Sequence, residues 1–558
     1  MPKRLGRLTM ICSIYCLFIP HFLFAQVSSD EIQEHLRNRV EAAGIPPKIT
    51  VGEELIYSSA VLPIFYERRA YWPAWSSEKG PLPQAYVLIS AIKKADQEGL
   101  TPQDYHCVKI ETLINEVREN LLNKRPLNLN RLVDIDILLT DAFLIYASHL
   151  LAGRIDPETI DPEWRADRRE ADLAEILQKA LESSEIKIAL FRLLPPQPGY
   201  ARLKETLAQY RSIVAHGGWN LIPDGSKMEK GQQGDRVKLL RERLIAEGEL
   251  KDTPYEESDV YDGTLEQAVR RFQKRCGLDV DGIVGSATQT ALNVSAEERV
   301  RQIEVNLERW RWLPQELGKR YILINIANFE LDVVEDNKPV LTMRAIVGRS
   351  YRRTPVFSDM MTYLVLNPCW YVPKKIAVQD IVPLARKDVE YFAKQNIKIF
   401  KGTGANAAQI DPRTIEWVTI TDKNFVYTFR QEPGRLNALG RIKFMFPNKY
   451  NVYIHDTPAK ELFAKAERGF SSGCIRIEKP VELAEYVLRS DPQWTKERIL
   501  AAIGKGVEQT VRLKTTIPVH LLYWTAWVDE DGAVQFRSDI YERDKLLDEA
   551  LREKPPKP

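Results

Sequence analysis

From about Val27 to Pro223 the sequence is predicted to be mostly helical, because apolar residues that recur every three to four positions indicate a helix. The clearest run extends from Ile135 to Leu150 and stops before Gly153, as expected for an amphipathic helix with a glycine at its end. His149 lies on the apolar face of this run. A histidine in that position is more often packed in a core than bound to a ligand, so we assign it no chemistry.

A second helical pattern is short and interrupted by turns. Val237, Leu240 and Leu244 form one apolar stripe, and a second stripe follows from Leu265 to Phe272. Glycine-bearing turns separate the stripes, at residues 261–263, 277–278 and 281–285. The pattern predicts a small helical bundle with tight loops.

From Arg320 the apolar positions alternate, which is typical of strands. The predicted strands are Tyr321 to Val334, Val340 to Val347, Met361 to Leu366, Asn451 to Ile454 and Cys474 to Ile477, with a hairpin turn at residues 336–338. The stretch from about Ile376 to Arg430 is more polar, and we expect it to be more helical. A helix from Val481 to Leu488 follows the last of these strands, and further strands begin at Val519. The chain as a whole is predicted to be a multidomain α+β protein with a mainly-β region flanked by helices.

The first 25 residues have a different composition. Lys3, Arg4 and Arg7 precede an apolar run that ends at the small residue Ala25, which is the arrangement of a secretory signal. The alternative is an uncleaved membrane anchor, but the run is barely long enough to span a bilayer and contains Pro20 and His21. We therefore expect export and removal of residues 1–25, and we expect no later segment to be long and apolar enough to cross a bilayer.

Composition and charge exclude several classes of protein. The 558 residues include 79 Lys and Arg against 77 Asp and Glu, and the formal net charge of +2 is unlike that of a nucleic-acid binder. Beyond the leader the chain has four scattered cysteines, Cys107, Cys276, Cys369 and Cys474, whose pairing the sequence leaves open. No CxxC and no His/Cys cluster has zinc spacing, so we expect no metal.

One cysteine and one histidine are suited to nucleophilic catalysis. His455 ends a predicted strand, and Cys474 follows 19 positions later after Ser472 and Gly473. A free thiol has a pKa of about 8.5, so it needs a base such as imidazole to react near neutrality. The N–H groups of Gly473 and Cys474 are suited to binding an oxyanion. By itself such a pair is a weak motif, because free cysteines are usually small buried hydrophobes.

The residues around this pair make the motif specific. His455 to Pro458, together with Ser471 to Ile477, resemble the signature of the L,D-transpeptidase (YkuD-type) family, most closely its large Gram-negative YcbB-like branch. Further matching segments are Val347 to Arg349, Thr354 to Ser358, Asn367 to Pro373, Asn437 to Phe444 and Phe446 to Asn448. The catalytic resemblance spans roughly residues 320–502.

The two helical regions also resemble parts of known proteins. Gly99 to Pro102 and Asp104 to His106 are similar to the scaffold of the same branch. The small bundle resembles the three-helix peptidoglycan-binding domain, through segments such as Tyr261 to Gly263 and Asp281 to Gly282. A bundle that has lost its glycan groove is the alternative.

The resemblance implies the following division of the chain. The expected parts are a signal peptide at 1–25, a helical scaffold domain at 26–225, a peptidoglycan-binding-like domain at 229–296, a catalytic domain at 318–502 with a capping subdomain at about 376–440, and C-terminal strands and a helix at 503–558 that pack on the scaffold.

The resemblance also implies a reaction without metal or organic cofactor. Cys474 would attack a peptidoglycan tetrapeptide stem, and the amine of a second stem would then resolve the thioester as a 3→3 cross-link. His455 would act as base and then acid, oriented by a backbone carbonyl, that of Asp456. Carbapenems would inactivate the same sulfur, and other wall-synthesis proteins are possible partners. The expected location is the periplasm.

The substrate-binding residues are expected around this pair. The commoner family pattern has histidine before Gly-Cys and asparagine two residues after the cysteine, where this chain has Ser472 and Arg476. Arg476 is a candidate for a stem carboxylate, with a structural ion pair as the alternative. The other candidates, for each of which a structural role is the alternative, are Ser471, Ser472, Tyr453, Trp370 and Tyr371.

Other functions remain open at this point. Water, a cross-link or a protein lysine can also resolve such a thioester, so the sequence identifies the acceptor poorly. A non-catalytic wall-binding scaffold is a second possibility, and a papain-like protease disagrees with the residues around Cys474. A cap over the site would favour an amine acceptor over water.

Overall fold

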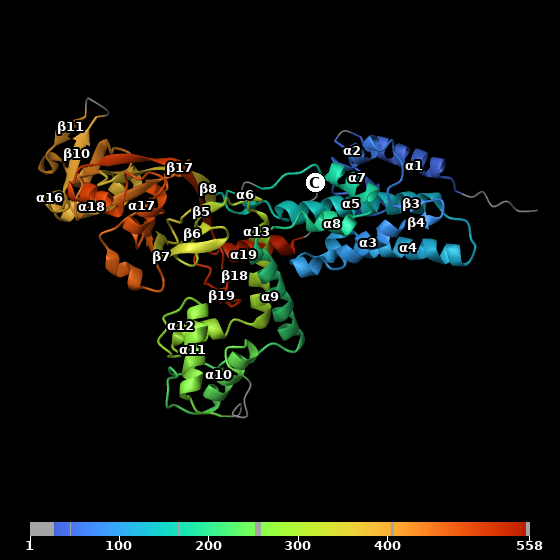
Figure 1. Ribbon diagram of the computed structural model, residues 1–558, viewed down its shortest axis with the longest axis horizontal. Coiled ribbons are helices and arrows are strands. Elements are labelled where there is room, and N and C mark those ends of the chain that lie inside the picture. The colour runs from blue at the N-terminus through green and yellow to red at the C-terminus, as the bar shows by residue number, and fades with distance from the viewer. Residues whose placement is uncertain (1–26, 45, 166–167, 252–257, 403–406, 554–558) are drawn as a thin grey trace, which may run out of the picture.

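The computed structural model describes residues 27–44, 46–165, 168–251, 258–402 and 407–553. The predicted leader at 1–25 lies outside the described residues. A helical lobe and a β-rich lobe occupy the two ends of the long axis, and a small helical bundle projects from between them (Figure 1).

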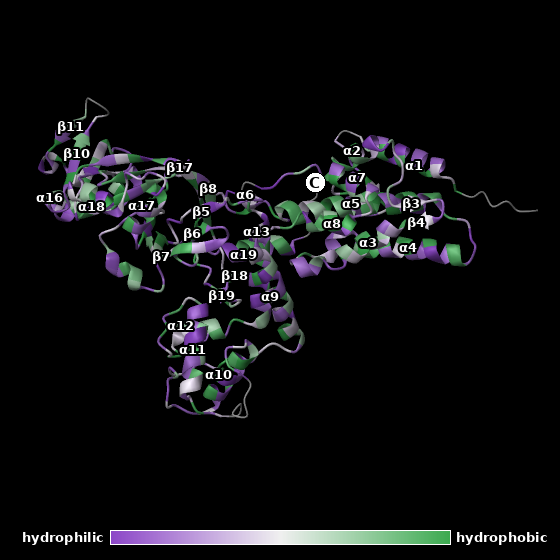
Figure 2. Ribbon diagram, in the orientation of Figure 1, coloured by the Kyte–Doolittle hydropathy of each residue, from purple (hydrophilic) through white to green (hydrophobic). Residues whose placement is uncertain are grey.

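The helical lobe is built around one long helix. Its helices are α1 (Ser29–Glu41), α2 (Leu62–Arg68), α3 (Pro83–Ile92), α4 (Cys107–Leu122), α5 (Leu129–Ala152), α6 (Pro157–Ile160), α7 (Leu173–Glu182) and α8 (Ile186–Phe191), with two short hairpins, β1 (Thr50–Val51) with β2 (Glu54–Leu55) and β3 (Ser76–Ser77) with β4 (Gly80–Pro81). Helix α5 is largely hydrophobic (Figure 2) and contacts most of the others.

Helix α5 corrects one expectation from the sequence. It is long and apolar enough to cross a membrane, but 83% of its most apolar window is buried inside the protein. It is therefore the core helix of this lobe. His149 on α5 packs beside Tyr105, whose hydroxyl lies 3.0 Å from its Nδ1.

The small bundle has the three predicted helices. They are α10 (Asp235–Ala246), α11 (Gly263–Arg275) and α12 (Ser286–Leu292), and the apolar residues of both predicted stripes are buried. Helix α9 (Pro198–Ala215) leads into the bundle and α13 (Ala296–Arg311) leads out of it. These two helices pack against each other and join the bundle to the rest of the molecule.

A nine-stranded sheet forms the β-rich lobe, in the order β15-β7-β16-β14-β13-β8-β17-β5-β6. Strand β6 pairs also with β7, so the sheet curls back on itself. The strands are β5 (Arg320–Asn325), β6 (Glu330–Glu335), β7 (Lys338–Gly348), β8 (Phe357–Leu366), β13 (Ile442–Met445), β14 (Ile454–His455), β15 (Gly469–Ser471), β16 (Ile475–Ile477) and β17 (Gln509–Leu522). Helices α17 (Pro480–Leu488) and α18 (Lys496–Gly504) follow β16 and share its hydrophobic core.

The polar segment that we expected to be more helical contains both helices and a second sheet. Its strands run in the order β11 (Ala408–Ile410), β10 (Ile397–Lys401), β12 (Tyr427–Gln431) and β9 (Trp370–Tyr371). Helices α14 (Lys374–Ile376), α15 (Val382–Lys387) and α16 (Tyr391–Lys394) accompany it, with a π-helical turn over Ala377–Ile381. The unit has its own aromatic core of Phe392, Trp417 and Phe429. We call this unit, residues 370–431, the cap.

The C-terminal segment divides between two places. Strand β17 is hydrogen-bonded between β8 and β5, so the nine-stranded sheet extends beyond the boundary predicted at residue 502. The hairpin of β18 (Ala526–Val528) and β19 (Val534–Phe536) packs on α9 and α13, and α19 (Arg543–Arg552) packs on α13 and α6.

Candidate active site

Two adjacent parallel strands bring the predicted nucleophile and base together. In the register of β14 and β16, Ile454 lies opposite Ile475 and His455 lies opposite Arg476. The Ile475 N–H donates to the Tyr453 carbonyl at 3.1 Å, which continues the register by one residue. The two isoleucines are buried in the core. Because side chains alternate along a strand, Tyr453, His455, Cys474 and Arg476 all lie on the opposite face.

The His455 ring is fixed in one tautomer. Its Nδ1–H donates to the carbonyl of Asp456 at 2.5 Å, which leaves Nε2 as the unprotonated nitrogen. Burial lowers the pKa of His455 to about 3, and the positive charges of Arg476 and Lys443 act in the same direction. The imidazole is therefore neutral at any physiological pH and able to accept a proton.

Asp456 acts through its backbone, and its carboxylate is occupied elsewhere. The carboxylate accepts hydrogen bonds from the Arg441 N–H at 2.8 Å, the Thr457 N–H at 2.7 Å and Lys460 Nζ at 2.5 Å. Gly440 packs directly against it, since a Cβ at that position would lie 2.3 Å from Asp456 Oδ2. These contacts hold the peptide whose carbonyl orients His455.

The loop before Cys474 is held by hydrogen bonds on several sides. Gly473 has a φ of +115°, a conformation that favours glycine. The Ser471 hydroxyl accepts from the Gly473 N–H at 3.1 Å and donates to the Cys474 carbonyl at 2.6 Å. Buried Thr354 donates to the Gly473 carbonyl at 2.9 Å. The Gly473 N–H is thus engaged within the loop, and of the two predicted oxyanion donors the Cys474 N–H is the better placed. Ser471 likewise holds the loop rather than facing a ligand.

The Cys474 thiol is half-buried and protonated. Its Sγ lies 3.9 Å from the carbonyl of Asn451. Burial raises the pKa of the thiol, while hydrogen bonding from Tyr453 and the charges of Lys443 and Arg476 lower it, and the net direction is upward. The other three cysteines in the described residues, Cys107, Cys276 and Cys369, are free thiols as well.

Lys443 belongs to this site although its role was not predicted from the sequence. It lies directly opposite His455 in the register of β13 and β14, and its Nζ is 3.9 Å from the centre of the Tyr453 ring. Burial lowers its pKa. Its position between Ile442 and Phe444, both buried, was the available signal, because a lysine alternating with core residues must face the other side of the sheet.

Arg476 has the features of a binding residue. It is half-buried, and it makes no ion pair with any residue that the structure describes. Its Nε has no hydrogen-bond partner there either. Burial and the charge of Arg349 lower its pKa. The alternative role of Arg476, in a structural ion pair, therefore finds no partner among the described residues.

The remaining predicted residues are divided between the site and the cap. Ser472 is exposed, and its hydroxyl accepts from Arg352 at 2.9 Å. Trp370 packs against the core of the cap. Burial raises the pKa of Tyr453, and a hydrogen bond with the Trp370 side chain lowers it. Trp370 therefore reaches the site from the cap. Tyr371, at 62% exposure, faces outward.

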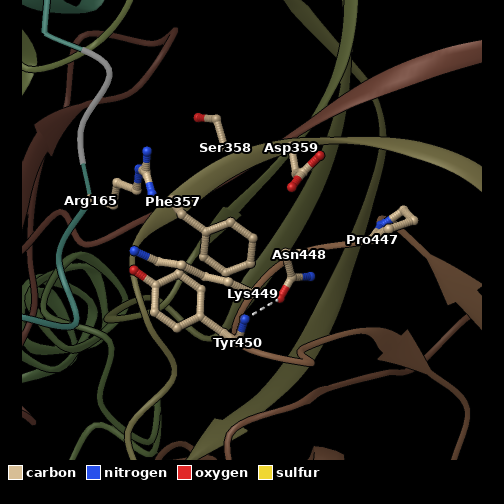
Figure 3. Close-up of a pocket in the computed structure, with 8 residues that line it drawn as sticks. All are labelled: Arg165, Phe357, Ser358, Asp359, Pro447, Asn448, Lys449 and Tyr450. Atoms are coloured by element: carbon tan, nitrogen blue, oxygen red, sulfur yellow. Dashed lines mark hydrogen bonds between the residues drawn. The ribbon is translucent and has the colours of Figure 1, made fainter.

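A cavity of about 510 Å³ lies beside the loop that carries Asn451 (Figure 3). Its walls include Lys449 and Tyr450 from this loop, the start of β8 and Arg165. The Tyr450 N–H donates to Asn448 Oδ1 at 3.0 Å, which shapes the loop (Figure 3). None of the predicted site residues lines this cavity. No group of three or more potential metal ligands occurs in the described part of the chain.

Three family models match the chain. They are a scaffold domain at residues 60–207, a "putative peptidoglycan binding domain" at 233–292 and an L,D-transpeptidase catalytic domain at 319–511. Sequence and structure agree on a multidomain protein with a helical N-terminal part, a bundle of the peptidoglycan-binding type and a mainly-β catalytic domain.

Two curated proteins are similar to parts of the chain. A "Putative L,D-transpeptidase" of Haemophilus influenzae is 34% identical over 254 residues, which are 45% of this chain and 50% of that protein. N-acetylmuramoyl-L-alanine amidase CwlL of Bacillus licheniformis is 43% identical over 68 residues, which are 12% of this chain and 19% of that protein. The chain thus spans at most about half the length of the curated relatives that it matches.

A solved L,D-transpeptidase from Stackebrandtia nassauensis aligns with 54% of this chain and 96% of its own length. Its sequence identity is 12% and its TM-score is 0.21, so no argument rests on this likeness.

Proposed function

The chain carries a catalytic domain of the L,D-transpeptidase family and a peptidoglycan-binding domain, and from this premise we propose that it forms 3→3 cross-links between peptidoglycan stems through a thioester on Cys474. The observation that carries the proposal is the register of β14 and β16. It sets a neutral, oriented imidazole and a half-buried thiol on the same face of neighbouring strands.

The first half of the reaction forms the acyl-enzyme. Cys474 Sγ attacks the carbonyl carbon of the diaminopimelate residue of a tetrapeptide stem, and the thiol proton passes to Nε2 of His455. The Cys474 N–H stabilises the oxyanion. The C–N bond to the terminal D-alanine then breaks, and His455 returns the proton to the leaving amine.

The second half transfers the acyl group. The side-chain amine of another stem attacks the thioester carbonyl, and His455 accepts a proton from it. The C–S bond breaks, and the sulfur leaves as a thiolate that takes the proton back from His455. The cycle begins and ends with a neutral Cys474 thiol, and His455 is neutral before and after each half, which agrees with the directions of their pKa shifts.

Positive charge around the sulfur supports this chemistry. Lys443 and Arg476 both stabilise a thiolate at Cys474. Arg476 is the proposed partner of a stem carboxylate, because its guanidinium has donor capacity to spare. Trp370, Tyr453 and Ser472 are proposed to line the stem, and Tyr371 to contact it from the rim of the cap.

The location and inhibitors follow from the same proposal. The leader pattern at residues 1–25 supports export to the periplasm, with cleavage after Ala25. Carbapenems should acylate Cys474, because they present a strained carbonyl to the same nucleophile.

The test is mass spectrometry of tetrapeptide-stem muropeptides incubated with the mature protein, beside Cys474→Ala. We expect a dimer joined through two diaminopimelates that is absent with the variant. Tripeptide without dimer would identify an L,D-carboxypeptidase instead. No product from a protein whose Cys474 also resists a carbapenem would contradict catalysis and favour a wall-binding scaffold.

A further inference from the structure

Arg352 makes contacts that the proposed chemistry does not explain. It lies in the loop between β7 and β8, and only 7% of its side chain is exposed. Its Nη1 donates to Asp380 Oδ2 at 2.5 Å and its Nη2 to Asp380 Oδ1 at 2.8 Å. This is the bidentate arrangement in which arginine binds a carboxylate most strongly.

The same guanidinium touches the loop of the nucleophile. Its Nη1 also donates to the Ser472 hydroxyl at 2.9 Å, two residues before Cys474. Its Nη2 donates to Gln379 Oε1 at 2.8 Å. Asp380 and Gln379 belong to the π-helical turn of the cap, Ala377–Ile381. One side chain therefore ties the cap to the nucleophile loop.

The loop that carries Arg352 is itself fixed to the site. The Arg349 N–H donates to the Ser471 carbonyl at 3.1 Å, and Thr354 donates to the carbonyl of Gly473. Residues 349–354 thus run along the nucleophile loop with hydrogen bonds on both sides of Arg352. The backbone that carries Arg352 is therefore fixed to the nucleophile loop on both sides of this residue.

The cap has a second attachment where the chain enters and leaves it. Asn437 Nδ2 donates to the Pro368 carbonyl and to the Glu432 carbonyl, each at 3.0 Å, and so joins the two connecting segments. This attachment is made by the connecting segments themselves. Arg352 instead comes from outside these segments and reaches the cap from the nucleophile side.

We propose that Arg352 is a positioning residue that holds the cap closed over Cys474, and that its pairing with Asp380 favours an amine over water as the acceptor. The effect on the choice between amine and water as acceptor rests on the proposed function. The effect of Arg352 on closing the cap does not. A closed cap limits the access of water to the thioester, and release of Asp380 would admit it. Asp380 lies in a π-helical turn, and such turns occur frequently at functional sites.

The closure is tested without substrate, on the full mature chain. Arg352→Gln and Asp380→Asn each remove the ion pair from one side, so a folding defect in one variant does not decide the result. Arg413→Gln is the control, since it removes an exposed ion pair with Glu390 in the same cap. The measurements are amide exchange over residues 377–387 and the rate at which N-ethylmaleimide modifies the Cys474 peptide.

We expect both rates to rise about tenfold in the two variants and to stay unchanged in the control, as fits the loss of a charge-assisted pair. Arg352→Lys should give an intermediate increase, because an ammonium keeps the charge without the fork. Wild-type rates in both test variants would overturn the closure, whatever the enzyme makes.

The choice between water and amine as acceptor is then measured from the muropeptide products. We expect the ratio of tripeptide to cross-linked dimer to rise about tenfold in both variants, with little change in Arg413→Gln. Faster modification with an unchanged ratio would overturn the role of the pair in acceptor choice. If the wild type itself makes no dimer, the proposed function fails, while the exchange and modification rates still decide the closure.

Discussion

At the scale of single residues, the catalytic pair is uncharged before substrate arrives. Burial keeps His455 neutral and keeps Cys474 protonated, and the nearby positive charges offset the second effect only in part. A thiolate–imidazolium pair is therefore not stored in the resting site. We expect the thiol proton of Cys474 to move to His455 only as the sulfur attacks the carbonyl carbon of the substrate. The thiolate is then a transient species, whose negative charge passes to the carbonyl oxygen.

This charge state predicts that the reactivity of the Cys474 thiol rises with pH, unlike that of a preformed thiolate–imidazolium pair. The thiolate fraction of Cys474 should grow about tenfold per pH unit from pH 6 to 8, because the raised pKa lies above this range. Alkylation by iodoacetamide, followed on the Cys474 peptide, should rise accordingly without a plateau. His455, with a pKa of about 3, adds no step in this range. A plateau near pH 7 would mean that the ion pair is preformed.

Lys443 should contribute to the reactivity of the thiol. Lys443→Met removes one of two positive charges beside Cys474, so the pKa of the thiol should rise further. We expect alkylation at pH 7 to slow about fivefold, the factor for roughly 1 kcal/mol of charge interaction. The control is Lys449→Met, which removes an exposed lysine from the loop beside the site. Equal slowing in both variants would point to net charge rather than to the position of Lys443.

At the scale of elements, the turn into β13 supports the base. Gly440 has a φ of +62°, and a Cβ there would meet the Asp456 carboxylate. Gly440→Ala should lower the free energy of unfolding by roughly 2–4 kcal/mol, from left-handed strain and overpacking together. It should also slow acyl-enzyme formation more than tenfold, because Asp456 would no longer orient His455.

Chemical denaturation and carbapenem acylation measure the two effects of Gly440→Ala. Gly504→Ala is the matched control, since nothing lies within 4 Å of a Cβ built at the end of α18. Normal acylation in a destabilised Gly440→Ala protein would show that the orientation of His455 does not depend on this turn.

The elements also show what the sequence could predict. The strands carrying His455 and Cys474 were predictable, because Ile454, Ile475 and Ile477 alternate with the residues of the site. The cap was expected to be more helical, and it combines short helices with a four-stranded sheet that was not predicted. Strands β10, β11 and β12 are only three to five residues long. Such short strands contain too few residues to show a clear alternation of apolar and polar positions. Lys443 and Arg352 were missed because their roles depend on partners that are distant in sequence.

At the scale of the whole molecule, buried arginines join distant segments. Arg543 on α19 pairs with Asp161 at 2.7 Å, across 382 positions of sequence. Arg309 on α13 pairs with Asp544 at 2.5 Å. Because an unpaired buried charge is costly, these pairs form only when the helical lobe, α13 and the C-terminal helix assemble together. The catalytic sheet is thus built onto a scaffold made from both ends of the described chain.

The bundle should bind the wall independently of catalysis. A polar groove of about 620 Å³ on α12 is lined by Ser286, Gln289 and Thr290, among others. Thr290→Trp fills this groove, so co-sedimentation with purified sacculi should weaken at least about fivefold, while turnover of soluble muropeptides stays unchanged. Thr264→Trp, at an exposed position on α11, is the control. Full binding by Thr290→Trp would mean that the bundle is a spacer and that the catalytic domain alone finds the stems.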